Sequence, residues 1–283
     1  MALLADYSSQ PVSAAALKKA GYQGAVRYIS PGREAWMKAK PLSKNEVEDF
    51  KKHGLELVSV WQYLKEDWRG GFNSGAENAR KALQKHKELG APSKAPVFFA
   101  IDSDPTLFEY NNIVAHYIKG ILSVIPKDQF GLYCNSKVHA WAEEDGFKHM
   151  WWKHNWGSDG ELNGCHIHQF EIDRAEVAGV KVDRNRTYQN VYGQWSAYQN
   201  VATKPVVKPA QGINSVGDLV KLFTDKFKSL VGQSTFATTL PHYIQLIDAS
   251  HYRIEKKTKA AEEKLDQVEL LLKQQKDSQS ESK

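Results

Sequence analysis

Short apolar runs alternate with helix-type patterns through residues 1–198, and this alternation constrains the fold more than any other feature. Eight runs have the length of strands: 3–5, 25–29, 57–61, 97–101, 130–133, 150–152, 166–170 and 180–182. Strands that alternate with helices at this spacing are typical of a parallel sheet, closed or open. The number of runs and the length of the segment favour a closed (β/α)8 barrel of the TIM type, an α/β fold.

The segments between the runs carry start and stop signals of helices. Ser13 is expected to cap a helix that ends near Ala20, and Ser43 with Glu46 forms an S-x-x-E capping box for a helix that ends at Gly54. Further helices are predicted over 76–89, 107–124 and 138–144. No G-x-G-x-x-G follows the first run, which argues against a dinucleotide-binding fold.

The composition changes after residue 198. Residues 199–212 are predicted to be a linker, 213–276 a helical, coiled-coil-like region, and 277–283 a disordered polar tail. The apolar stripe of a long helix over 240–274 must be buried. Its partner is either the helix predicted over 213–231 or the same segment of other copies. The unbroken four-three spacing favours the second partner, a homo-oligomer.

Composition and charge narrow the classes of function. Hydrophobic residues make up 41% of the 283 residues and charged residues 25%, as is ordinary for a soluble globular protein. No run is long enough for a membrane helix, and Asp6 interrupts the first apolar run, so we expect synthesis in a cytoplasm without a signal peptide and no membrane partner. The net charge of +5 suits an anionic polymer such as a cell wall, but the charges are scattered, so no nucleic acid partner is predicted.

Four carboxylates follow or end the predicted strands: Asp6, Asp102, Asp104 and Asp183. Catalytic groups of barrels lie at the C-terminal ends of the strands, so these four are the candidate catalytic residues. Asp102 and Asp104 are two residues apart and are expected to share one face, where repulsion raises one pKa. Glycoside hydrolysis uses such a pair. Alternatively, Asp104 caps the following helix and only Asp102 is functional.

Other polar or aromatic residues at the same strand ends are candidates for substrate binding. Arg27 could orient a carboxylate or form a structural ion pair, and the indole of Trp152 could stack on a sugar or fill the core. His166 and His168 form an H-x-H half-site for zinc, but no second motif accompanies it, so neither a metal nor any other cofactor is predicted. The candidates for substrate binding are Arg27, Gln62, Tyr133, Trp152, His168 and Gln169.

Taken in order, several segments resemble a known family. They are LLADYSS, ALKKAGYQGAVRYIS, LSKNEVEDFKKHGLELVSVW, ARKALQKHKELGAP, PVFFAIDSD, GLYCN, HIHQF and VDRN with YGQW. They resemble the glycoside hydrolase-like domain family of actinobacteria and their phages, which is similar to the family-25 muramidases. The resemblance implies a TIM-type barrel in which Asp104 stands where muramidases carry a catalytic Glu. It also implies that Gln62 stands where the family often carries Glu.

Two functions follow from the carboxylates and the resemblance. The first is a phage-encoded, endolysin-like hydrolase that acts at the bacterial cell wall and cuts glycosidic bonds in peptidoglycan. In it, Asp104 is the general acid and Asp102 the base or stabiliser, and Asp6 and Asp183 support them. The second is a non-catalytic glycan-binding module of a phage or surface structure, oligomerised through its C-terminal helix. Gln62, which cannot exchange a proton, favours the second.

Overall fold

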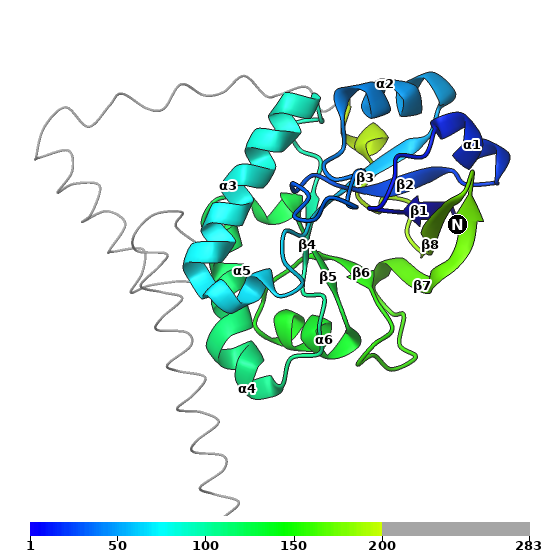
Figure 1. Ribbon diagram of the computed structural model, residues 1–283. Coiled ribbons are helices and arrows are strands. Elements are labelled where there is room, and N and C mark those ends of the chain that lie inside the picture. Colours follow the sequence, from blue (N-terminus) through cyan, green and yellow to red (C-terminus); the bar gives the residue numbers. More distant parts are fainter. Residues whose placement is uncertain (200–283) are drawn as a thin grey trace, which may run out of the picture. The chain divides into compact units, whose positions relative to one another are not determined.

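A computed structural model describes residues 1–199 (Figure 1). Contacts divide the chain into a first unit, Met1–Ala202, and a second, Thr203–Lys283. The predicted linker beyond residue 199, the helical region over 213–276, the tail over 277–283 and the oligomer contact over 240–274 lie outside the described residues.

Eight strands close into a barrel in which each strand pairs with its neighbours in chain order. This confirms the predicted strand number and the closed α/β barrel. Strands β1 to β7 are parallel to one another. The strands are β1 (Leu3–Asp6), β2 (Gly24–Tyr28), β3 (Glu56–Trp61), β4 (Val97–Ala100), β5 (Phe130–Cys134), β6 (Met150–Lys153), β7 (Cys165–Val177) and β8 (Val180–Thr187).

The direction of β8 corrects the predicted all-parallel (β/α)8 topology. β8 is antiparallel to both β7 and β1, so the barrel is mixed. The reason is the two-residue connection between β7 and β8, in which Ala178 and Gly179 have φ of 51° and 78°. Positive φ at both positions matches the tight hairpin turn that joins antiparallel strands, and a parallel return needs a much longer crossover. The ribbon shows β7 and β8 as one long hairpin (Figure 1).

Helices cover the barrel between β1 and β6. Ser13 and Ser43 cap α1 and α2 as predicted, through bonds from the backbone N–H of Ala16 and Glu46. The helix predicted over 107–124 is interrupted by a π-helical turn, and its first turn is capped by Thr106 in a capping box with Glu109. The helices are α1 (Ala14–Lys19), α2 (Lys44–His53), α3 (Gly71–Leu89), α4 (Leu107–Glu109), α5 (Ala115–Leu122) and α6 (Ser136–Glu144). Among the described residues, no helix is long and apolar enough to cross a membrane.

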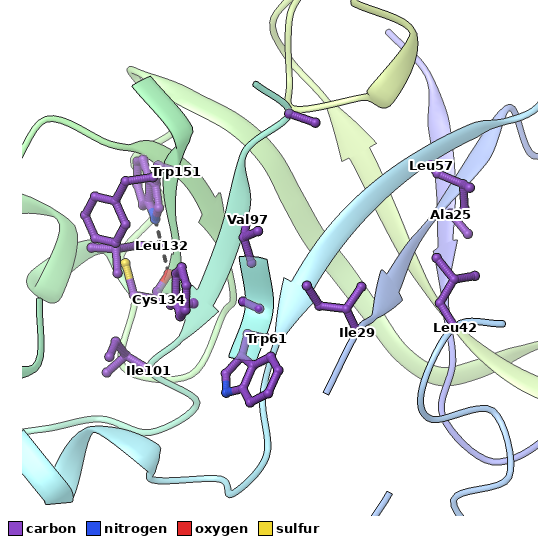
Figure 2. Packing of buried hydrophobic residues seen from close by; sticks show 14 of the residues in the cluster. Ala25, Ile29, Leu42, Leu57, Trp61, Val97, Ile101, Leu132, Cys134 and Trp151 are labelled. Atoms are coloured by element: carbon purple, nitrogen blue, oxygen red, sulfur yellow. Dashed lines mark hydrogen bonds between the residues drawn. The ribbon is translucent and has the colours of Figure 1, made fainter. Parts of the chain in front are cut away.

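Strand alternation builds two hydrophobic clusters, one on each face of the barrel wall. Leu4, Val26 and Phe98 belong to the cluster inside the barrel. Their chain neighbours Ala25 and Val97 belong to the larger cluster outside the wall. Figure 2 shows this outer cluster from Leu57 and Ala25 across to Cys134 and Trp151. The inner cluster fills the interior of the barrel, so a ligand can enter only at an end.

Candidate active site

Strand register brings Asp6 and Asp183 together at the end of the barrel where β1 to β7 finish. Asp6 is the last residue of β1, two residues after the interior residue Leu4, so its side chain faces the interior. Asp183 pairs directly with Asp6 across the antiparallel β1/β8 contact. Asp183 thus reaches this rim near the start of β8, whereas the sequence-based prediction placed it at the end of a parallel strand.

Two buried side-chain amides hold these carboxyl groups. Asn185 Nδ2 donates to Asp6 Oδ2 at 2.5 Å. Gln169 Nε2 lies 3.1 Å from Oδ2 of Asp6 and also 3.1 Å from Oδ2 of Asp183. The backbone N–H of Asp173 completes the arrangement by donating to Asp183 Oδ1 at 2.8 Å. Asp6 therefore accepts two amide bonds on one oxygen, an arrangement that stabilises its ionised form.

Two aromatic side chains fix the orientation of the amides. The Trp152 indole N–H donates to Asn185 Oδ1 at 2.8 Å, and the Tyr133 hydroxyl donates to Gln169 Oε1 at 2.6 Å. Each amide therefore accepts through its oxygen and presents its NH2 group to the carboxylates. Trp152 is 1% exposed, so the predicted stacking of its indole on a sugar is wrong. Tyr133 and Gln169 are also buried and act beneath the rim rather than as exposed contacts for a substrate.

Burial separates the proton affinities of the two carboxyl groups. It raises the pKa of Asp6 from 3.8 to about 6, against the bonds from Asn185 and Gln169, which lower it. Burial also raises the pKa of Asp183 to about 8, and the charge of Asp6 is the second cause. At neutral pH, the Asp6–Asp183 pair therefore retains one proton.

Asp102 is a third carboxylate in the same electrostatic environment. It lies just beyond β4 and is half-buried, and Gln62 Nε2 donates to its Oδ2 at 2.7 Å. Burial raises the pKa of Asp102, while the bond from Gln62 and the charges of Lys65 and Lys40 lower it. The charge of Asp102 in turn contributes to the raised pKa of Asp6 and of Asp183.

Sequence reasoning missed three residues of this site, Tyr28, Lys40 and Asn185. Tyr28 ends β2; burial and then the charges of the three carboxylates raise the pKa of its phenol, which therefore stays protonated. Lys40 Nζ lies 3.8 Å from the centre of the Tyr28 ring, and burial lowers the lysine pKa to about 8. The alternation of side chains along a strand could have predicted two of them. Tyr28 is two residues after Val26, and Asn185 is two residues after Asp183, so each shares the face of the earlier residue. No local sequence pattern indicates Lys40, whose position is set by the loop between β2 and α2.

The contacts of the Asp104 side chain differ from the two that were predicted, repulsion by Asp102 and capping of the following helix. Its side chain is 44% exposed, and its Oδ1 contacts Lys137 Nζ at 2.6 Å and Asn135 Nδ2 at 2.8 Å. Its carboxyl group also packs so closely against Gly157 that a Cβ there would collide with it. The capping alternative is wrong, because Thr106 caps α4. The raised pKa of Asp102 results from burial, not from the predicted repulsion by Asp104.

Arg27 lies outside the barrel wall, contrary to the prediction that it binds substrate. Its guanidinium is fully buried, bonds to Glu46 at 2.6 Å and donates to the carbonyl oxygens of Tyr7 and Ala39 at 2.8 and 2.7 Å. The reason is that successive side chains of a strand point to opposite faces. The neighbouring residue Val26 faces the interior, so Arg27 faces α2. The structural ion pair, the alternative interpretation of Arg27, is the correct one.

His168 also lies on the outer face, contrary to its predicted place in the site. It alternates with the interior residues Ile167 and Gln169, and its Nε2 lies 2.6 Å from Asn155 Oδ1. Both errors have one physical cause, because residues one position out of step on a strand point to opposite faces.

Comparison with known proteins identifies the family of this barrel. A family model described as Rv2525c-like, glycoside hydrolase-like domain matches residues 15–187. The chain belongs to this family. The predicted resemblance to a glycoside hydrolase-like family is confirmed, while the links to phages and to family-25 muramidases stay predictions.

Relatives in sequence and structure agree with this assignment. Rv2525c of Mycobacterium tuberculosis, named as a candidate peptidoglycan hydrolase, is 38% identical over 200 residues, which span 68% of this chain and 83% of the relative. The crystal structure of Rv2525c, described as Tat-secreted and in complex with L-tartrate, matches with a TM-score of 0.67 over 69% of this chain and 98% of that one. A Bacillus stearothermophilus protein, 17% identical, matches with a TM-score of 0.50 over 67% and 97%, a likeness of fold alone.

Proposed function

We propose that the chain is a hydrolase of bacterial cell-wall glycan that cleaves glycosidic bonds of peptidoglycan at this rim. The observation that carries the proposal is the Asp6–Asp183 pair, in which burial of both groups and the charge of Asp6 beside Asp183 leave one carboxyl protonated at neutral pH. A carboxylic acid that keeps its proton beside ionised carboxylates is what glycoside hydrolysis needs. The name of the relative Rv2525c points to the same substrate class.

The geometry favours Asp183 as the general acid. Asp183 is half-buried at the rim, so a leaving-group oxygen can reach it, whereas Asp6 is 2% exposed. In the proposed step, the bond between the sugar C1 and the leaving-group oxygen breaks while the Asp183 proton moves to that oxygen. The oxygen of a water molecule bonds to C1, and its proton passes to the Asp102 carboxylate, which also stabilises the positive charge on the sugar. Asp6 is a positioning residue that raises the proton affinity of Asp183.

These roles differ from those predicted from the sequence, in which Asp104 was the acid. The Oδ1 of Asp104 is occupied by contacts with Lys137 Nζ and Asn135 Nδ2, an arrangement that suits a side chain that orients substrate. Protonation by Asp104 remains the competing assignment, and separate variants of the two residues distinguish them. The proposed reaction requires only carboxyl groups and water, and therefore no metal or other cofactor.

One observation favours a non-catalytic glycan-binding module instead. Gln62 follows Trp61, at the position where the resemblance in sequence implies a Glu; its side-chain amide cannot exchange a proton and donates a hydrogen bond to Asp102. In this second candidate function, the chain holds a cell-wall glycan without cutting it. The predicted homo-oligomer through residues 240–274 would then increase the avidity of binding, and light scattering of the full chain tests that association.

Purified actinobacterial peptidoglycan distinguishes the candidates in one experiment with two readouts. The full chain is incubated with the insoluble glycan, and both released reducing ends and co-sedimented protein are measured. A hydrolase releases reducing ends, and Asp183→Asn slows the release by about 10²–10⁴-fold while the protein still sediments. A binding module sediments without release. Asp104→Asn tests the competing acid, and Asp128→Asn, an exposed acid in the turn before β5, is the matched control.

A further inference from the structure

A cluster of histidines lies on the outside of the barrel, where α6 connects to β6. His139 and Glu143 are four residues apart on α6 and so share one face of the helix. His149 lies in the connection, one residue before β6 begins. One ligand atom from each of the three residues lies within 4.8 Å of the others.

The hydrogen bonds of the cluster determine which ring nitrogens are free. His149 Nδ1 lies 2.6 Å from the carbonyl oxygen of Phe147 and must carry the proton that bonds to it. His149 Nε2 then has a lone pair, and it lies 3.0 Å from His139 Nδ1. Two imidazole nitrogens that bind one zinc ion tetrahedrally lie about 3.3 Å apart, because each Zn–N bond is about 2.0–2.1 Å. A small shift of the rings therefore accommodates an ion between them.

Both rings are held in place by aromatic neighbours. The His139 ring stacks on the indole of Trp151, with centroids 3.8 Å apart and planes inclined by 8°. The His149 side chain is fully buried, and its ring lies 6.0 Å from that of Phe130. A bond from the second ring nitrogen to a backbone carbonyl, as in His149, is the usual way in which proteins orient a ligand histidine.

The types of donor atom suit a metal ion. A carboxylate oxygen of Glu143 lies within 4.8 Å of a ring nitrogen of each histidine, and the Glu143 side chain is 49% exposed, so it can turn toward an ion. Two neutral imidazoles and one carboxylate form a donor set that zinc prefers.

We propose that His139, Glu143 and His149 bind a divalent transition metal ion, zinc being the one that best fits the donor set. The H-x-H pair of the sequence lies outside this set: His166 Nδ1 accepts from the backbone N–H of Trp151, and His168 contacts Asn155.

The position of the cluster gives the ion a structural role. His149 precedes β6 and therefore lies toward the end of the barrel opposite the rim carboxylates. An ion here joins α6 to the start of β6, next to β7. Bound metal would stabilise the folded chain by mass action and leave the rim carboxylates untouched.

Zinc binding to the full, chelator-treated chain tests the proposal. Isothermal titration with Zn²⁺ is combined with Co²⁺ substitution, whose visible spectrum reports tetrahedral nitrogen and oxygen ligands. We expect saturable binding and a higher Tm with Zn²⁺. Glu143→Gln and His149→Ala should each weaken binding by about tenfold or more. The matched control is His53→Ala, which removes an α2 histidine that pairs with Asp49.

Two results would overturn the proposal. One is the absence of saturable binding at micromolar Zn²⁺, and the other is binding that Glu143→Gln leaves unchanged. The Glu143 variant decides the matter even if His149→Ala fails to fold, because the Glu143 side chain is half exposed and its loss cannot disturb the core. An unchanged Co²⁺ spectrum in Glu143→Gln would equally remove the carboxylate from the site.

Discussion

Asp6 and Asp183 share one hydrogen-bond donor, the Nε2 of Gln169, which lies 3.1 Å from an oxygen of each. The two residues also face each other in register across β1 and β8. Like charges directly opposite on paired strands are destabilising. The fold tolerates this pair because one member keeps its proton, so the chemistry of the rim and the stability of the barrel are linked.

This linkage predicts how stability changes with pH. The folded-state pKa of Asp183, about 8, lies above the usual value of 3.8, so the folded chain binds this proton more tightly than the unfolded chain. The resulting stabilisation is complete below about pH 4 and is lost as pH rises toward 8. Asp183→Asn removes this dependence. Its Tm should therefore exceed that of the wild type at pH 8.5 by at least about 3 °C, corresponding to roughly 1 kcal/mol.

The measurement is thermal unfolding of both proteins from pH 4 to pH 9 by circular dichroism. Asp128→Asn serves as the control, since this exposed acid lies in the turn before β5. Parallel Tm profiles of wild type and Asp183→Asn would show that Asp183 has an ordinary pKa and would remove the basis for its role as acid.

Gln169→Glu should destabilise the barrel more at high pH than at low pH. The substitution replaces the shared donor by a third carboxyl group beside Asp6 and Asp183, and Gln169 is 3% exposed. A buried carboxylate that loses its donor and gains like-charged neighbours costs on the order of 3 kcal/mol. Urea unfolding at pH 5 and pH 8 measures the difference, with exposed Gln10→Glu as control. An equal loss at both pH values would contradict the shared-donor arrangement.

Alternation explains which parts of this site could be predicted from sequence. The apolar runs identified the eight strands, and placing polar residues at strand ends found Asp6, Asp102 and Gln62. The runs did not determine which alternate residues of each strand face the interior, so Arg27 and His168 were predicted on the wrong face. The face that a residue occupies depends on the register with the neighbouring strand, and the periodicity of a single strand does not reveal that register.

The direction of β8 and the contacts between distant segments could not be predicted from the sequence, for a different reason. The sequence V-A-G-V at residues 177–180 contains the hairpin turn, but a Gly after Ala also fits a loop that leads to a helix. The antiparallel β8 was therefore missed, and with it Asn185. Asp104, Lys137 and Gly157 come from the segment after β4, from α6 and from the segment after β6, and no local sequence pattern predicts contacts between such distant segments.

Arg27 should be essential for stability and not for glycan binding. Its fully buried guanidinium pairs with Glu46, and removing one partner of a buried pair costs about 3–5 kcal/mol. Arg27→Met should lower the free energy of unfolding by that amount, as measured in urea. The double variant with Glu46→Met should be more stable than Arg27→Met. Glycan co-sedimentation per folded molecule should stay at the wild-type level, and its loss would return Arg27 to the binding site.

Gly157→Ala should move Asp104. Gly157 has φ of +66°, and an added Cβ would collide with the Asp104 carboxyl group. The backbone strain alone costs about 1–2 kcal/mol. The matched control is Gly160→Ala in the same loop, where a Cβ meets open space and stability should change by less than about 0.5 kcal/mol. Equal stability of the two variants in urea would contradict the close approach of Gly157 to Asp104.

The pH dependence of glycan cleavage tests the central claim, that Asp183 is the proton donor, most directly. Initial rates of reducing-end release from purified peptidoglycan are measured for wild type and Asp183→Asn from pH 5 to pH 9. Wild-type kcat/KM should fall as pH rises through about 8, where Asp183 loses its proton. Asp183→Asn should be slower by about 10²–10⁴-fold and should lack that limb. An Asp183→Asn variant that keeps both the wild-type rate and the wild-type pH profile would contradict the account.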